Sequence, residues 1–202
     1  MKDFNREVAL DYDNDIRRKV LGYDVLQAHI TTILKHELKE NARVLVVGCG
    51  TGEEIKRLED NFSQITIIGI DPSEEMLEVA KSKVSSSLIH SDIQSFEDKE
   101  GFDCVISVLV SHFIPLEKDQ KKDFFQSVRK LLKEDGLLIG ADLMDFGLEK
   151  YYFKLLQEKM GKSFFPIKRS QFEELTKSCC FGSPSYYFNS MGICGYLMKV
   201  VN

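Results

Sequence analysis

Three glycines at alternate positions, Gly48, Gly50 and Gly52, give this sequence its clearest indication of a bound ligand. They follow an apolar run of strand length and come directly before a segment with helical spacing. Glycine allows a tight turn there, and because it has no Cβ it lets a ligand approach the main chain. The N-terminus of the following helix adds free N–H donors. The loop therefore predicts a ligand-binding turn between a strand and a helix.

The spacing of these glycines distinguishes two kinds of ligand. The dinucleotide-binding fingerprint requires a glycine three positions after the second one. Here that position is Glu53, and a second acid, Glu54, follows it. A carboxylate at this place repels a pyrophosphate. The loop therefore favours a ligand without phosphate groups, and an NAD(P)-dependent oxidoreductase is the alternative within the same fold class.

Acidic residues follow the next two predicted strands, where they can accept hydrogen bonds from a nucleoside. Asp71 ends the second strand, the position at which a carboxylate binds ribose hydroxyls in nucleotide-binding α/β proteins. An ordinary capping role for Asp71 is the other interpretation, and Ser73 is expected to cap the next helix. Asp92 follows the third strand and is placed to accept from an adenine amino group, while Ile93 packs on the ring.

Two polar residues near the ends of later strands are candidates for catalysis. His112, after the fourth strand, has the chemistry of a base near neutral pH, or it caps a loop or helix. Asp142, at the end of the fifth strand, can steer a cationic acceptor, or it ties down the strand end. Arg17 is a third polar candidate, for an anionic acceptor or a ligand carboxylate. The sequence has no H-E-x-x-H motif and no cluster of metal ligands, so no metal site is predicted.

Strand-length apolar runs alternate with helical segments, which is typical of a parallel sheet covered by helices on both faces. The predicted strands of this part are Arg43–Val47, Ile65–Ile70, Ser87–His90, Phe102–Val108 and Leu137–Leu143. Ser170–Glu173 has the capping-box pattern and is expected to begin a short helix. Two strands follow, Ser185–Phe188 and Ile193–Val201, and their short connection allows only an antiparallel pair. We therefore predict an α/β fold with a mostly parallel sheet that ends in an antiparallel hairpin.

The first forty residues stand outside this alternation. A polar segment that contains Tyr12 leads to a predicted helix over residues 23–40, whose apolar residues lie on one face. These forty residues are expected to cover the sheet or to act as a lid, within one domain over residues 1–202.

With the glycine loop, Asp71 and Asp92 in this order, the sequence resembles the class I S-adenosylmethionine-dependent methyltransferases. The resemblance covers nearly the whole chain. It implies a Rossmann-like three-layer sandwich whose seven-stranded sheet has its last strand antiparallel, and it implies S-adenosylmethionine as the cofactor. The residues that it assigns to the cofactor are Gly48, Cys49, Gly50 and Gly52 for the methionine part, Asp71 and Pro72 for the ribose, Asp92 and Ile93 for the adenine, and Met76 and Val108 beside them.

A narrower resemblance concerns the N-terminus. Tyr12-Asp13-x-x-Ile16-Arg17, followed by Gly22-Tyr23-Asp24, is similar to the opening of the branch that includes the carboxy-S-adenosylmethionine synthases of tRNA wobble-uridine modification. This resemblance adds Tyr12 and Tyr23 to the cofactor site. The sequence departs from the branch at Leu21, where proline is usual, and at Leu175, where the synthases place an arginine for the extra carboxylate. Because a leucine cannot pair with a carboxylate, ordinary methyl transfer is the predicted reaction.

Composition restricts the partners. The chain has 202 residues and a formal net charge of −5, which disfavours a protein that holds nucleic acid by bulk charge. No apolar run approaches the roughly 18 residues that a membrane helix needs, and the first ten residues contain no apolar signal core. Five cysteines without a C-x-x-C pair indicate free thiols. We expect a cytoplasmic protein that does not bind a membrane.

These observations together predict a methyltransferase that acts on a small molecule, with tRNA as a less favoured acceptor. The N-P-P-Y signature of DNA amino-methyltransferases is absent after the fourth strand, so DNA is not expected as a substrate. Aromatic residues at Tyr151, Tyr152, Phe153, Phe164 and Phe165 favour packing, with an apolar or aromatic acceptor as the second interpretation. A non-catalytic cofactor-binding module is the alternative from a different functional class.

Overall fold

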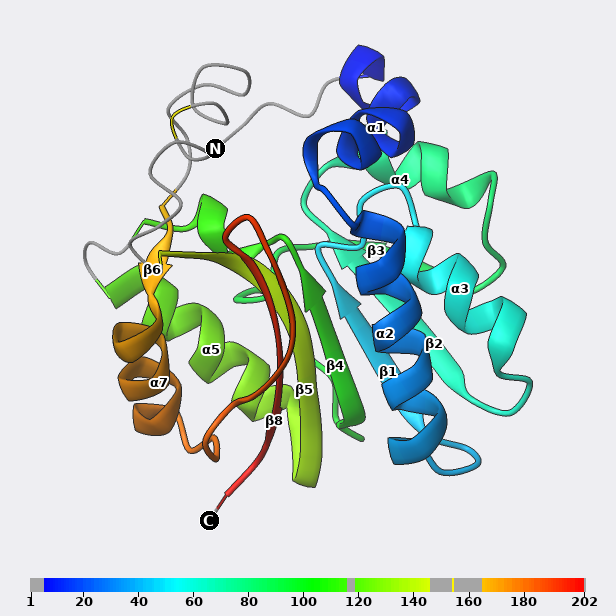
Figure 1. Cartoon of the computed structure of the whole chain (residues 1–202). Coiled ribbons are helices and arrows are strands. Elements are labelled where there is room, and N and C mark those ends of the chain that lie inside the picture. The colour runs from blue at the N-terminus through cyan, green and yellow to red at the C-terminus, as the bar shows by residue number, and fades with distance from the viewer. Residues whose placement is uncertain (1–5, 116–118, 146–153, 155–164, 202) are drawn as a thin grey trace.

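A twisted sheet forms the centre of the computed structural model, which describes residues 6–115, 119–145, 154 and 165–201 (Figure 1). Seven strands lie in the order β3-β2-β1-β4-β5-β8-β7, and a two-residue strand, β6, pairs with the end of β5. The strands are β1 Arg43–Val47, β2 Thr66–Asp71, β3 Ser87–His90, β4 Phe102–Val108, β5 Leu132–Asp145, β6 Ile167–Lys168, β7 Ser185–Ser190 and β8 Ile193–Lys199. The first five run parallel, and β8 is antiparallel to both of its neighbours. The predicted Rossmann-like sheet with an antiparallel end is confirmed.

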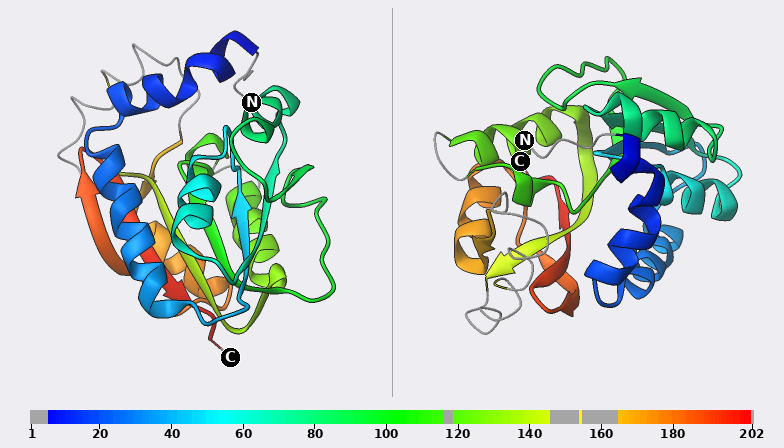
Figure 2. Two further views of the ribbon diagram at one scale, coloured as in Figure 1. Left: turned by 90° about the vertical axis from the view of Figure 1, so that its right-hand side faces the viewer. Right: turned by 90° about the horizontal axis from the view of Figure 1, so that it is seen from above.

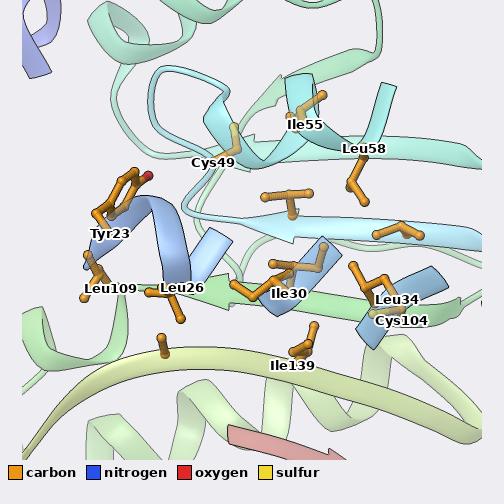
Figure 3. Packing of buried hydrophobic residues seen from close by; sticks show 14 of the residues in the cluster. Tyr23, Leu26, Ile30, Leu34, Cys49, Ile55, Leu58, Cys104, Leu109 and Ile139 are labelled. Atoms are coloured by element: carbon orange, nitrogen blue, oxygen red, sulfur yellow. The ribbon is translucent and has the colours of Figure 1, made fainter. Parts of the chain in front are cut away.

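Helices cover both faces of the sheet and complete three layers (Figures 1 and 2). The described helices are α1 Arg6–Lys19, α2 Tyr23–Glu37, α3 Glu53–Asn61, α4 Glu74–Lys81, η1 Ser111–Phe113, α5 Gln120–Leu131 and α7 Arg169–Ser178. One apolar cluster joins α2, α3 and α4 to the sheet, and a second joins α5 and α7 to the opposite face. Figure 3 shows the first cluster, in which Leu26, Ile30 and Leu34 of α2 point toward the sheet.

The alternation of side chains along the strands explains both clusters. Val44 and Val46 of β1 belong to the cluster under α2, whereas Leu45 and Val47 belong to the cluster under α5. Successive residues of a strand point to opposite faces. A parallel strand covered on both faces therefore needs a continuous apolar run, which is the pattern that β1 and β4 show.

Three helices differ from the predictions, and the bounds of β2, β5, β7 and β8 also differ from the predicted ones. Helix α1 includes Ala9–Asp13, which was expected to be a polar segment, and the apolar spacing missed the helix because only Ala9 and Ile16 are buried on it. The helix predicted over residues 23–40 ends at Glu37, since Leu38 takes an extended conformation. Helix α7 begins at Arg169, before the predicted Ser170 cap, and the Lys168 N–H donates to Gln171 Oε1 at 3.3 Å instead.

A bulge in β7 brings two aromatic side chains onto the same face. The pairing with β8 shifts between Tyr186 and Phe188, so Tyr187 and Phe188 both contact His29 of α2. The Tyr187 side chain extends across β8. Its hydroxyl donates to the Gly140 carbonyl of β5 at 2.9 Å. It passes over Gly195, where a Cβ would lie 2.6 Å from the tyrosine ring. Glycine at this position is therefore required by packing.

Candidate cofactor-binding site

The glycine loop has the geometry that its sequence predicts. Gly48 and Gly50 have φ of 62° and 51°, in the left-handed region that favours glycine. A Cβ at Gly48 would lie 2.6 Å from Val110 Cγ2, so the loop after β1 rests directly on the loop after β4. A Cβ at Gly50 would meet nothing within 4 Å, so a ligand has room to lie against this part of the main chain. The loop therefore fits a ligand that contacts its backbone.

Asp71 lies beside this loop at the carboxyl end of β2. Its Oδ2 accepts from the Gly50 N–H at 2.8 Å, and its Oδ1 accepts from the Ser73 N–H at 2.8 Å. Burial raises the pKa of the Asp71 carboxyl, although both N–H groups act in the opposite direction. Each carboxylate oxygen has two lone pairs, so both can still accept from a hydroxyl. The capping role and a ribose-binding role are thus compatible.

The remaining predicted adenosine contacts surround the ends of β2, β3 and β4. The Ser73 hydroxyl caps α4 as predicted, since it accepts from the Met76 N–H at 3.2 Å, and Met76 itself is buried. The Pro72 carbonyl lies 2.9 Å from His90 Nε2. Asp92 is exposed and accepts from the Ser95 N–H at 2.8 Å. The last two predicted contacts are the buried Ile93 and the half-buried Val108.

Helix α1 lies over the glycine loop, near the carboxyl ends of the parallel strands (Figure 2). The Thr51 hydroxyl donates to Asp13 Oδ1 at 2.5 Å, and Lys83 at the end of α4 pairs with Asp13 Oδ2. Arg17 Nη2 donates to Glu53 Oε1 at 2.9 Å. Side chains of α1 thus reach both the loop and the first turn of α3. The contact between Asp13 and Thr51 was not predicted, because no pattern in the sequence indicates that these two residues meet.

Tyr12 and Tyr23 come together around Glu54, in the first turn of α3. The Tyr23 hydroxyl lies 3.5 Å from Glu54 Oε1, and Gln27 Nε2 donates to the same oxygen at 2.5 Å. Burial raises the pKa of Tyr12, and the charges of Glu54 and Asp71 raise it further. Tyr12 therefore lies near both carboxylates. The structure brings the two predicted tyrosines to the glycine loop. It also places Gln27 beside Glu54, the second acid after the loop.

His112 and Asp142 form a buried pair beyond β4 and β5. His112 Nδ1 lies 2.5 Å from Asp142 Oδ1, and the same oxygen accepts from the main-chain N–H groups of His112 at 3.0 Å and Leu143 at 2.9 Å. Burial raises the pKa of the Asp142 carboxyl, but His112 and the buried Lys121 outweigh that effect and hold it below its usual value. Asp142 is therefore ionised near neutral pH, and the imidazole donates its Nδ1 hydrogen to it.

Hydrogen bonds also connect Phe165 to His112 and to Lys121. The Phe165 N–H donates to the His112 carbonyl at 2.7 Å, and Lys121 Nζ donates to the Phe165 carbonyl at 2.8 Å. Among the residues that the structure describes, Asp142 Oδ2 and the Tyr196 hydroxyl are buried without a hydrogen-bond partner. The other aromatic residues expected near an acceptor, Tyr151, Tyr152, Phe153 and Phe164, lie outside the described residues.

Comparison with known proteins connects this site to one family. A model of the methyltransferase domain matches residues 44–136. The chain is 28% identical to a carboxy-S-adenosyl-L-methionine synthase of Campylobacter hominis, over 86% of this chain and 78% of the relative. It is 37% identical to a Geobacillus protein named as a methyltransferase, over 58% of this chain and 49% of that protein. The fold matches a Synechocystis magnesium protoporphyrin IX methyltransferase with bound S-adenosylhomocysteine, with a TM-score of 0.73 and 15% identity over 93% of this chain and 87% of that one.

Residues 44–136 match a methyltransferase domain, and together these findings support a class I S-adenosylmethionine-dependent methyltransferase. Its cofactor is S-adenosylmethionine, as predicted. The matched residues 44–136 contain the glycine loop, Asp71, Asp92 and His112, whereas helices α1 and α2 lie outside them. The family match therefore covers the predicted nucleoside contacts and leaves out the two N-terminal helices.

Three further findings concern membrane helices, metal-binding groups and the thiols. No helix within the described ranges is long and apolar enough to cross a membrane. Over the same ranges, no group of three or more His, Cys, Asp or Glu side chains is arranged to hold a metal ion. The five cysteines are free, as predicted, and Cys180 is the exposed one.

Proposed function

We propose that this methyltransferase acts on a small-molecule acceptor, by in-line displacement at the ends of β4 and β5, with His112 as the base. The observation that carries the proposal is the buried His112–Asp142 pair, joined at 2.5 Å. With its Nδ1 hydrogen donated to Asp142, a neutral imidazole has its basic lone pair on Nε2. His112 then removes a proton from an acceptor that must lose one.

The protein's contribution is mainly to position the reactants. When bound, S-adenosylmethionine supplies the electrophilic methyl group and the leaving group. In this proposal Gly48, Gly50 and Gly52 hold the methionine part and Asp71 holds the ribose. Helices α1 and α2 cover the site and exclude water, with Tyr12 and Tyr23 on their inner side. Orientation of this kind contributes several kcal/mol to the rate, about 7 kcal/mol or more in well-aligned systems.

Two observations favour a small acceptor over tRNA. The net charge of −5 opposes binding to a polyanion. Asp142 is buried beside the Ser111 side chain, which helps to lower its pKa, and its carboxylate oxygens have further lone pairs for a group that donates a hydrogen bond. The Synechocystis protein is named for magnesium protoporphyrin IX, a small molecule, which supports the same class. We therefore expect an acceptor with an N–H or O–H donor beside the methylated atom.

The experiment that tests the acceptor class uses the purified protein and methyl-labelled S-adenosylmethionine. One reaction contains a cell metabolite extract freed of nucleic acid, and the other contains total tRNA. Label transferred to the small-molecule fraction is the expected result. Label found only in tRNA contradicts the proposal.

The second candidate is synthesis of carboxy-S-adenosylmethionine, favoured by the 28% identity to the Campylobacter synthase over 86% of this chain. Leu175 opposes it, because its side chain packs against the apolar cluster under α5 and has no charge for a second carboxylate. Mass spectrometry of the cofactor that co-purifies with the protein separates the two reactions. A cofactor heavier by one CO₂ would establish the synthase and overturn ordinary methyl transfer.

A further inference from the structure

Lys121 is buried on the apolar face of helix α5. Its side chain is 1% exposed, and it precedes the buried residues Phe124, Phe125 and Val128 at the spacing of a helical stripe. An apolar residue is expected at such a position, since lysine is rarely fully buried unless its charge is paired. A residue that departs from the packing pattern in this way is a candidate for a functional role.

The main chain of Phe165 connects Lys121 to the His112–Asp142 pair. Lys121 Nζ donates to the Phe165 carbonyl at 2.8 Å, and the Phe165 N–H donates to the His112 carbonyl at 2.7 Å. The His112 N–H in turn donates at 3.0 Å to Asp142 Oδ1, the oxygen that lies 2.5 Å from the imidazole Nδ1. These hydrogen bonds form a continuous path from the ammonium group to the carboxylate. Loss of the first bond therefore removes one support of His112.

Lys121 also acts on the pair by its charge. Burial raises the pKa of the Asp142 carboxyl, and the positive charges of His112 and Lys121 outweigh that effect. Two titratable groups of β8 face the same carboxylate, since Cys194 is its partner in the sheet and Tyr196 is influenced by its charge. Burial raises the pKa of both, so neither carries a charge near neutral pH. Without Lys121, the Asp142 carboxylate would attract a proton to the imidazole more strongly.

We propose that Lys121 is a positioning residue for His112. Its ammonium group balances the charge of Asp142 and so opposes protonation of the imidazole, and its bond to Phe165 holds the main chain of His112 in place. In this proposal Lys121 touches neither the cofactor nor the acceptor. The inference rests on the proposed function, in which His112 is the base and must be unprotonated to act.

The test compares the wild type with Lys121→Met, whose side chain has a similar length and no charge. NMR follows protonation of the His112 imidazole, which is identified by comparison with His112→Gln. Because the like charge of Lys121 disfavours an imidazolium, the midpoint of this titration should lie about one pH unit higher in Lys121→Met. Lys130→Met is the matched control, since it removes an exposed charge from the same helix and should keep the wild-type midpoint. Lys121→Arg keeps the charge and should also keep that midpoint.

Label transfer from methyl-labelled S-adenosylmethionine to the metabolite extract freed of nucleic acid gives the second measurement. In Lys121→Met the acid side of the pH–activity profile should move by the same amount. Transfer should fall about tenfold on that side and recover at higher pH, while the Kd of S-adenosylhomocysteine stays within about twofold of the wild-type value. A purely structural role for Lys121 would not produce this recovery.

An unchanged titration midpoint in Lys121→Met overturns the proposal, and so does a loss of transfer that is equal at every pH. Lys121 would then only tie α5 to Phe165. If Lys121→Met does not fold, Lys121→Gln provides the same comparison. The NMR measurement needs no acceptor, so it separates this inference from the proposed function. A raised midpoint in a protein that transfers no label to small molecules supports the role of Lys121 and contradicts His112 as the base.

Discussion

The Thr51 hydroxyl donates to Asp13 across 38 residues of sequence, and this 2.5 Å contact joins the first helix to the glycine loop. Asp13 also pairs with Lys83, so one carboxylate links α1, the loop and α4. Helix α1 and the glycine loop are therefore joined by direct side-chain contacts. With the cofactor on the glycine loop as proposed, we expect its release past α1 to require loss of these contacts.

Thr51→Val removes the hydroxyl with little change in shape, and it should accelerate release of the cofactor. One hydrogen bond contributes about 0.5–1.5 kcal/mol, so the dissociation rate of S-adenosylhomocysteine should rise about two- to tenfold in stopped-flow measurements. Thr32→Val is the control, because the Thr32 hydroxyl bonds to Ala28 within α2. Equal rates for Thr51→Val and the wild type would show that α1 is not a cover. Added salt should accelerate release from the wild type, because it screens the Asp13–Lys83 and Arg17–Glu53 pairs.

Gly48→Ala and Gly50→Ala should fail in different ways. Both positions have positive φ, which costs an alanine about 1–2 kcal/mol. At Gly48 the new methyl also overlaps Val110, at 2.6 Å, so urea unfolding should show the larger loss of stability for this variant. At Gly50 the methyl enters open space beside the loop, so cofactor binding should be lost while most of the stability remains. A Gly50→Ala protein with normal affinity would show that the ligand does not lie against this residue.

Asp142→Asn tests the catalytic pair and carries a pH signature. Because the folded pKa of Asp142 lies below its ordinary value of 3.8, its charge stabilises the fold above that pH. This contribution is lost as pH falls through the folded pKa. The wild type should therefore be more stable than the variant at neutral pH, by about 1–3 kcal/mol, and the difference should vanish in strong acid. If His112 is the base, kcat should fall about a hundredfold or more, with the cofactor Kd unchanged. Full activity in the variant would leave the pair with a structural role alone.

Glu54→Gln should make the ligand-free protein more stable. Burial raises the folded pKa of Glu54 above its ordinary value of 4.5, so the charged form is disfavoured in the fold. Wild-type stability is therefore lost as pH rises through the folded pKa, and the variant avoids this loss. Thermal unfolding at neutral pH should show a higher Tm for the ligand-free variant. A lower Tm would mean that the Gln27 contact outweighs the cost of the buried charge.

Gly195→Ala should destabilise the sheet, because its methyl would lie 2.6 Å from the Tyr187 ring and 2.9 Å from Phe188 Cβ. Overpacking of this kind costs about 1–3 kcal/mol. Gly182→Ala is the comparison, since its nearest neighbour would be 3.3 Å away at Val201 Cγ1. Urea unfolding should rank Gly195→Ala well below Gly182→Ala. Equal stabilities would contradict the bulge geometry at Tyr187.

The parallel half of the fold was predictable from sequence, because buried strands leave a strong pattern. Arg43–Val47, Ser87–His90 and Phe102–Val108 were predicted with the observed bounds. Their apolar runs reflect cover on both faces of the sheet. Helix α1 was missed for the converse reason, since it lies on the surface and is held mainly by polar contacts that leave no apolar period. The two-residue β6 is too short to leave any pattern.

In the candidate site, too, some residues were predictable from sequence and others were not. Residues fixed by backbone demands, such as Gly48 and Gly50, are visible in the sequence because few other residues tolerate positive φ. Glu54 was not singled out, because a carboxylate in the first turn of a helix is ordinarily explained by the helix dipole. The residues that contact the Glu54 carboxylate, Gln27 and Tyr23, lie about 30 residues earlier. They meet Glu54 only after α2 packs on α3. Contacts of this kind follow from tertiary packing and leave no local signal.

Strand β8 is inserted between β5 and β7, so the order of strands in space differs from the order of their synthesis. While the chain emerges from the ribosome, β5 keeps an unpaired edge until Ile193–Lys199 has been translated. At about 5–20 residues per second this exposure lasts several seconds. An exposed edge in a nascent chain pairs readily with other strands and promotes aggregation. Conditions that slow translation of residues 146–199 should therefore lower the soluble yield of this enzyme.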